Sequence, residues 1–276
     1  MKSKKPLIPY LIWMAIFVVI PLAMVLIDAF TDNATGAFTL SNFKRIFFED
    51  PTLRTCFLDS LRVALISTLL CLVLAYPVAL LMARQKPSTQ RFLHFLIMLP
   101  MWMNFILRIC SWMLVLQPNG ILDSLLRSVG LLASGATNSI NQSEFAVILC
   151  IVYNYLPFMI LPIYTTVAKI PRSLFEAGED LGCSRGRVLT RIIFPLSVPG
   201  VISGLTMVFV PAMSSFVISM KLGGFALMGD IIDTYYKGAG ADPHLGAAIS
   251  VVLMFFIVLS IALMNRFDKD DDVVLA

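Results

Sequence analysis

The chain has 276 residues, of which 58% are apolar and 14% charged, whereas soluble domains contain about 45–50% apolar residues. A net charge of +4 is too small to indicate a nucleic-acid-binding surface, and the five cysteines contain no CxxC pair. These properties exclude a soluble domain and favour a membrane protein without a disulfide framework, a metal site or a cofactor.

Six segments have the length of about 20 apolar residues that a helix needs to cross a bilayer. The first follows a basic head, but no small-residue cleavage site comes after it, so we expect a retained anchor rather than a signal peptide. The predicted fold class is all-α, a polytopic membrane bundle of six transmembrane helices. The six spans are 7–27, 61–83, 92–116, 145–168, 198–219 and 245–264.

Lysine and arginine gather in the segments that would face one side of the membrane. Thirteen of them lie in the two terminal tails and in the loops after the second and fourth spans, against seven in the three loops that face the other way. Because short basic loops stay in the cytoplasm, we expect both termini there. We divide the chain into an N-terminal part (1–60), a core (61–265) with a long cytoplasmic loop (169–198), and a tail (266–276).

Two outward loops have the pattern of a short amphipathic helix. In the first, Phe43, Ile46 and Phe47 share one side of a helix that Ser41 would cap. The second follows the third span and begins at Gln117. For both segments, we expect packing against other helices rather than binding of a partner.

The cytoplasmic loop is much longer than the roughly 2–8 residues that join neighbouring helices, so it must have a structure of its own. Ser173 and Glu176 have the spacing of a capping box, which predicts a helix from Leu174. Gly182 suits a left-handed cap at the end of that helix. A second helix would begin after Ser184 and end at two prolines, Pro195 and Pro199.

Both predicted helices are amphipathic, which alone would also fit a hairpin lying on the membrane surface. On the first, Glu176, Glu179 and Asp180 lie opposite a small apolar face made of Leu174, Ala177, Gly178 and Leu181. On the second, an apolar face points away from Arg187 and Arg191, and it consists of Val188, Leu189, Ile192 and Ile193.

This loop resembles the EAA loop of ABC importer permeases, EAA-x3-G-x9-I-x-L-P, with Gly178 at the third alanine and Phe194 at the leucine. The resemblance implies a coupling helix that docks in a groove of a separate ATPase subunit. Glu176 would meet a basic group there, Ala177 and Gly178 would allow close contact, and Gly182 would set the turn. The other matching positions are Ile192 and Pro195.

No GxxxxGK[ST] phosphate-binding loop occurs in the chain, so we expect no enzyme activity of its own and ATP hydrolysis by a partner. Segments that begin at Leu99, Tyr153 and Phe209 look like the B-type permease subunit of spermidine/putrescine importers. That resemblance implies a type I ABC importer permease of the bacterial inner membrane. Its implied partners are a second related permease, two ATPase subunits and an outer substrate-binding protein.

The resemblance makes a polyamine the expected solute, carried through an alternating-access pathway of which this chain forms half. Another small solute and a non-ABC secondary transporter remain alternatives, although the latter needs a midplane ionisable pair that the spans lack. No acidic residue lies between Asp59 and Asp123 or between Asp180 and Asp230. In related polyamine permeases an acidic residue often precedes the FVI of the fifth span, where this chain has two serines.

Polar and aromatic residues of the spans are the remaining candidates for the solute path, with helix packing or interfacial anchoring as the competing interpretation of each. Arg108 would lie ~24 Å up a straight third helix, near the outer interface. There it would reach lipid headgroups, or form an outer-gate contact to carbonyls or to a carboxylate of the paired permease. The candidates are Trp102, Asn104, Arg108, Tyr153, Asn154, Tyr155, Ser214 and Ser215.

Three prolines, Pro157, Pro162 and Pro211, interrupt the fourth and fifth spans. They free backbone groups that only protein or water can bind within the bilayer, which favours a cavity between helices.

Overall fold

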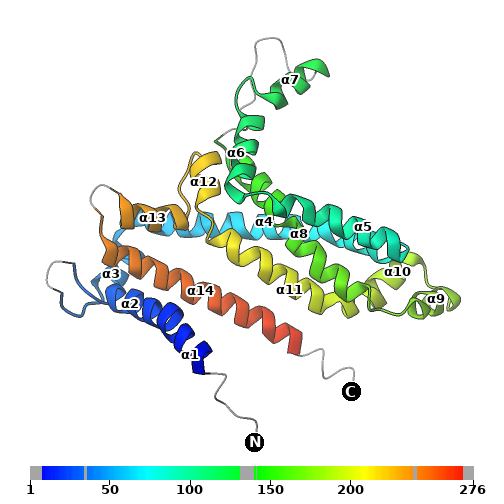
Figure 1. Cartoon of the computed structure of the whole chain (residues 1–276), viewed down its shortest axis with the longest axis horizontal. Helices are drawn as coiled ribbons and strands as arrows, with labels where there is room; N and C mark the ends of the chain where they lie inside the picture. The colour runs from blue at the N-terminus through cyan, green and yellow to red at the C-terminus, as the bar shows by residue number, and fades with distance from the viewer. Residues whose placement is uncertain (1–7, 34–35, 131–139, 141, 239–240, 270–276) are drawn as a thin grey trace, which may run out of the picture.

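The computed structural model describes residues 8–33, 36–130, 140, 142–238 and 241–269, and the described chain is mainly helical, as predicted. Its centre is α8 (Glu144–Val167), which packs against α4 (Pro51–Ala83) and α11 (Phe194–Met213). On the far side of α11 lies α14 (Pro243–Lys269), and α2 (Ile20–Ala29) packs on α14 (Figure 1). The buried apolar side chains form two clusters, one on the side predicted to face outward, which we call the outer core, and one on the side predicted to face the cytoplasm, which we call the inner cluster.

Five helices of the described chain are long and apolar enough to cross a membrane, and a bent pair makes six, which agrees with the six predicted spans. The pair consists of α5 (Pro87–Met98) with the 3₁₀ turn Leu99–Trp102, and α6 (Phe105–Leu116). The two halves meet at an angle of 87°. The third span is therefore not a straight rod, and the prediction that Arg108 lies ~24 Å up such a rod is wrong.

Proline explains several irregular helical turns. A π-helical turn, Ala15–Val19, joins α1 (Ile8–Met14) to α2 and ends two residues before Pro21. A second π turn, Leu189–Ile193, stands at the same distance from Pro195. Proline lacks an N–H and clashes with the carbonyl four residues back, and one wider turn relieves both problems.

The second of these turns joins α10 (Arg185–Val188) to α11, so one continuous helix covers Arg185–Met213. The prediction that Pro195 and Pro199 end the cytoplasmic helix is therefore wrong. The fifth span is also displaced from 198–219, because α11 stops at Met213 and a short helix, α12 (Val217–Leu222), follows after a break.

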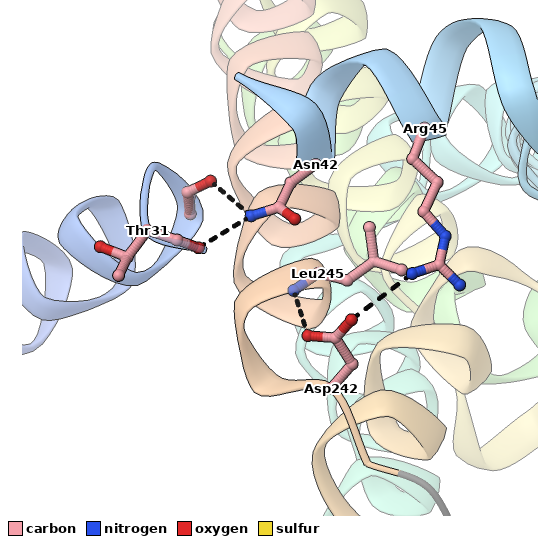
Figure 2. A network of polar contacts seen from close by, with 6 residues as sticks. Thr31, Asn42, Arg45, Asp242 and Leu245 are labelled. Carbon is pink, nitrogen blue, oxygen red and sulfur yellow. Dashed lines mark hydrogen bonds and ion pairs between the residues drawn. The ribbon is translucent and has the colours of Figure 1, made fainter. Parts of the chain in front are cut away.

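On the side predicted to face outward, α3 (Ser41–Lys44) and the π turn Arg45–Glu49 connect the first and last spans (Figure 2). Asn42 Nδ2 donates to the carbonyls of Ala29, at 3.2 Å, and Thr31, at 3.1 Å. The Arg45 guanidinium lies 3.5 Å from Oδ2 of Asp242, whose Oδ1 accepts from Leu245 N at 3.2 Å at the start of α14.

The predicted packing of this outward segment is confirmed for Ile46, which is buried, and for Phe43, which packs on the outer core. Phe47 instead remains 49% exposed. Ser41 is the first residue of the helix rather than its cap. The cap position is held by Leu40, whose side chain makes no capping hydrogen bond.

The segment after the third span forms α7 (Ile121–Ser128), a helix as predicted. Figure 1 shows α6 and α7 leaving the bundle sideways. The prediction that this segment packs against other helices is correct for Leu122, which contacts the outer core. Ile121 and Leu125, however, are each 58% exposed. The expectation of packing is therefore met only in part.

A buried polar contact holds α13 (Met228–Lys237) to its neighbours on the outer side. Oδ2 of Asp230 accepts from Ser219 Oγ of α12 at 2.5 Å and from the backbone N of Leu227 at 2.8 Å. Oδ1 of the same carboxylate is buried without a hydrogen-bond partner. Burial raises the pKa of Asp230, although these two hydrogen bonds act in the opposite direction.

We expect Asp230→Asn to flatten the pH dependence of stability. Because the pKa of Asp230 is higher in the folded chain, the folded state holds a proton that the unfolded state has lost between the two pKa values. The free energy of unfolding of the wild type therefore falls as the pH rises through that window. Thermal unfolding of the purified chain from about pH 4 to 8 measures the slope. Glu49→Gln, at an exposed carboxylate on another element, is the control, and equal slopes in wild type and Asp230→Asn would contradict the assignment.

Candidate coupling hairpin and candidate solute path

The long loop predicted at 169–198 forms the predicted helical hairpin. Its first helix, α9, covers Arg172–Asp180 and therefore begins two residues before the start predicted from the capping box. Leu174 N donates to the carbonyl of Pro171 at 3.1 Å, so Ser173 lies within the first turn rather than in front of it. Proline stops the helix from extending further back, because it fits only the first turn.

Gly182 makes the turn of the hairpin in the predicted left-handed conformation, with a φ of +77°. Leu181 N donates to the carbonyl of Ala177 at 3.1 Å, and Cys183 N donates to that of Gly178 at 3.0 Å. The second bond is the long-range bond of a Schellman motif, which satisfies carbonyls that the end of the helix leaves open. The chain then turns into α10 after Ser184, whose backbone is extended but whose side chain makes no capping hydrogen bond.

Gly178 lets the two helices of the hairpin touch. A methyl group on its Cα would lie 2.9 Å from Cγ2 of Val188 and 3.2 Å from Cδ1 of Ile192. Val188 is 3% exposed and Ile193 fully buried, so the apolar face predicted for the second helix is the one that packs inward. Gly178 and Ile192 of the EAA pattern therefore contact each other within the chain.

The other side of α9 faces away from the protein and is apolar. Leu174 is 39% exposed and Leu181 is 84% exposed, and Ala177 lies exposed between them. The four residues predicted to share one apolar face therefore do not all point the same way. Gly178 packs inward, whereas Leu174, Ala177 and Leu181 point outward. Glu176 is also exposed, but it lies on the other side of the helix. The three outward-pointing apolar residues, Leu174, Ala177 and Leu181, form what we call the hairpin face.

A hollow of about 430 Å³ separates the hairpin from the C-terminal ends of α4 and α8. Phe175 reaches toward the bundle there, and the guanidinium carbon of Arg84 lies 5.4 Å from the centre of its ring. Phe175 packs against the inner cluster of buried apolar side chains, and this contact anchors α9 to the bundle. The wall of the hollow includes Arg84, Gln90, Phe175, Glu176 and Arg185.

Ile192 and Pro195 lie at the base of the hairpin. Ile192 belongs to the π turn and is partly buried on the inner cluster, and Pro195 follows in the first turn of α11. Since α10, the π turn and α11 are continuous, these residues connect the hairpin directly to the membrane-spanning part of the helix.

Arg108 and Tyr153 are the two path candidates that the structure brings together. Both line a hollow of about 230 Å³, along with Met103, Ser111, Trp112 and Val115. The ring of Trp112 meets that of Tyr153 edge to face, with the ring centres 5.3 Å apart. Trp112 was not predicted, although its spacing of four residues from Arg108 places the two on one face of a helix.

The Arg108 side chain is buried, with 8% of the residue exposed. Its Nε and Nη1 have no hydrogen-bond acceptor, and its guanidinium carbon lies 5.8 Å from the centre of the Phe105 ring. Such a cation–π contact is worth about 2 kcal/mol when desolvated, whereas burying an ion costs several kcal/mol. The ring therefore does not compensate the buried charge.

The remaining candidates lie apart from that hollow or bond within their own helix. Asn104 is the cap of α6, where its Oδ1 accepts from Ile106 N at 2.9 Å and Leu107 N at 3.4 Å. Trp102 is 72% exposed and meets Phe95 edge to face. Asn154 is buried, and its Nδ2 donates to the carbonyl of Cys150 at 2.8 Å.

Tyr155 packs with Phe158 and is partly buried. Ser214 and Ser215 occupy the break between α11 and α12. Ser215 is buried, whereas Ser214 is exposed and donates to the carbonyl of Val210 at 3.1 Å. The contact of Ser219 with Asp230, next to this break, was not predicted from the sequence, because eleven residues separate the two side chains.

Comparison with known proteins places this arrangement in a family. Residues 75–270 match the family model of the binding-protein-dependent transport system inner membrane component. The chain is 36% identical to the spermidine/putrescine transport system permease protein PotB of Escherichia coli over 93% of this chain and 94% of that protein. For the PotB protein of Haemophilus influenzae, the identity is 34% over 93% of this chain and 91% of the relative.

The fold agrees with the sequence comparison. A bacterial ABC transporter involved in the import of the acidic polysaccharide alginate superimposes with a TM-score of 0.79, at 16% identity, over 96% of this chain and 94% of that one. At this identity the likeness concerns the fold alone. The chain thus belongs to the family of binding-protein-dependent transport system inner membrane components and is a multi-pass permease subunit of an ABC transporter of the inner membrane.

Proposed function

We propose that this chain is one of two permease subunits of an ATP-driven importer for a polyamine such as spermidine or putrescine. The observation that carries the proposal is the 36% identity, over 93% of the chain, to a spermidine/putrescine permease. A polyamine is a flexible cation, so its route should offer carboxylates, aromatic faces or backbone carbonyls. Carboxylates for the solute would come from the second permease and from an outer binding protein.

The hairpin is the part of this chain that couples transport to a separate ATPase subunit. Its hairpin face offers an exposed apolar surface, and the exposed carboxylate of Glu176 lies on the other side of the same helix, which together suit an apolar groove with a basic group at its edge. Shifting a two-state pore from 1:99 to 99:1 takes about 5.5 kcal/mol of differential binding. The continuous helix Arg185–Met213 gives that energy a stiff path from the hairpin into the membrane.

The topology follows from the same assignment. A hairpin that binds an ATPase lies in the cytoplasm, on the side that holds thirteen of the lysine and arginine residues. Both termini lie on that side as well. Cysteine accessibility at the two ends of the chain in intact cells and in inverted vesicles measures this orientation.

We expect Glu176→Ala to lower both solute uptake and solute-stimulated ATP hydrolysis by about tenfold, which corresponds to the loss of one charged contact. The measurement uses the complete transporter in proteoliposomes, with putrescine, spermidine and spermine as solutes. Glu49→Ala removes an exposed carboxylate on the outer side and is the control. Wild-type values of both activities in Glu176→Ala would contradict the coupling role.

The identity of the solute is tested separately, by uptake into the wild-type transporter. If the wild-type transporter hydrolyses ATP but takes up none of the three polyamines, the permease assignment stands and the polyamine is wrong. A different small solute is the second candidate, because the chain has no acidic residue at 60–122 or 181–229 and buries the uncompensated Arg108.

A further inference from the structure

The hollow beside Arg108 lies just past the sharp bend of the third span. Asn104 caps the first turn of α6, and Arg108 stands one turn further on. Figure 1 shows α6 leaving the bundle sideways from this point, so Arg108 lies at the root of the projecting α6–α7 arm. Met103 and Val115 provide apolar walls of the hollow, while Ser111, Trp112 and Tyr153 provide its polar edges.

This hollow holds a cation that lacks an anion. Arg108 is buried, and two of its three guanidinium nitrogens have no acceptor. Arginine keeps its charge in proteins, so it does not escape the cost of burial by losing a proton. Charged residues within spans pair with one another or with backbone carbonyls, or they mark a solute pathway. The span of Arg108 and the adjoining loops offer no carboxylate from residue 60 to residue 122.

We propose that Arg108 is the receptor for a carboxylate that enters this hollow from outside the chain. The guanidinium fork matches the two oxygens of a carboxylate and carries the opposite charge. A polyamine does not fill the role, because its ammonium groups repel the guanidinium. This inference rests on the proposed function in one respect, namely that the chain works beside a second permease and carries a solute.

The carboxylate has two sources that share this chemistry. One is an acidic side chain of the paired permease, which would lie against the projecting arm. The other is a carboxylate carried by the solute itself. Ornithine is putrescine with one added carboxylate, so this pair of solutes separates the two sources.

The test compares wild type, Arg108→Met and Arg108→Lys, both as the full chain alone in detergent and as the complete transporter. The readouts are the unfolding temperature and the uptake of putrescine and ornithine. In the chain alone, Arg108→Met keeps or raises the unfolding temperature, because it removes a buried cation that has no partner. Arg108→Lys keeps the charge and retains most of the wild-type behaviour in the complete transporter.

If the paired permease supplies the carboxylate, Arg108→Met lowers the unfolding temperature of the complete transporter and lowers uptake of both solutes by about thirtyfold or more. If the solute supplies it, that unfolding temperature does not fall, and uptake of ornithine alone drops by this factor. Arg54→Met, at an exposed arginine near the outer end of α4, is the matched control and changes none of these values.

The proposal is overturned if Arg108→Met changes neither the unfolding temperature of the complete transporter nor the uptake of either solute. It is also overturned if Arg108→Met destabilises the chain alone, or if Arg108→Lys is as defective as Arg108→Met. A wild-type transporter that takes up no putrescine contradicts the polyamine assignment. In that case the unfolding temperatures of wild type and Arg108→Met, whose measurement needs no solute, still test whether Arg108 binds a carboxylate.

Discussion

Gly200→Leu is expected to break the contact between α8 and α11 and to prevent recovery of a folded chain. A Cβ at this position would lie 2.5 Å from Oγ1 of Thr166 and 2.7 Å from the carbonyl oxygen of Pro162. The second obstacle is backbone, so rotation of a side chain does not remove it. Overpacking of a core costs typically about 1–3 kcal/mol, and a leucine adds three more carbons in the same direction.

The contact has this importance because helices in lipid gain little from the hydrophobic effect when they associate. They rely on close packing, and small residues let the backbones approach. Fluorescence-detected gel filtration and thermal unfolding of the detergent-solubilised chain measure the effect. Gly204→Ala should cost less, since the nearest atom is Sδ of the flexible Met159 side chain.

Gly186→Leu is the matched control for Gly200→Leu. Gly186 belongs to the same continuous helix, but a Cβ there meets nothing within 4 Å. Both substitutions therefore change the same residue type on the same helix and differ in the space available. An unfolding temperature of Gly200→Leu equal to that of Gly186→Leu would refute the packing argument.

The number and rough place of the spans could be predicted because length and apolar character are properties of a segment by itself. The hairpin could be predicted for a similar reason, since the conformation of Gly182 and the inward face with Val188 and Ile193 follow from local rules. The first turn of α9 was placed two residues late. There, Pro171 rather than the capping-box serine fixes the start.

The structural features that could not be predicted depend on contacts between residues far apart in the sequence, or on how a helix adjusts its turns around a proline. Proline predicts a helix end, but a π turn before Pro195 carries the helix onward. The bend of the third span falls between Pro100 and the α6 cap Asn104, and neither residue by itself distinguishes a bent span from a straight one. For the path candidates, the sequence supplied residue types, while the structure shows that Arg108 and Tyr153 share a hollow.

Gly182→Val is expected to uncouple ATP hydrolysis from transport and to reduce solute uptake by the complete transporter about tenfold or more. Gly182 has a φ of +77°, which costs roughly 1–2 kcal/mol for a residue with a Cβ and more for a β-branched one. Space is not the obstacle, because a Cβ there meets nothing within 4 Å. The strain is released if the turn changes, which moves the hairpin face away from its position on the bundle.

A series at this position separates the backbone from other causes. Asparagine tolerates the left-handed conformation better than other residues with a Cβ, so uptake should follow the order glycine, asparagine, alanine, valine. Gly36→Val is the matched control, because Gly36 has a similar φ of +66° and equally open surroundings but lies on the outer side. It carries the same local strain without touching the hairpin, so it should lower stability slightly and leave the ratio of uptake to ATP hydrolysis unchanged. Equal losses of that ratio in Gly36→Val and Gly182→Val would show that general destabilisation, rather than the turn of the hairpin, is responsible.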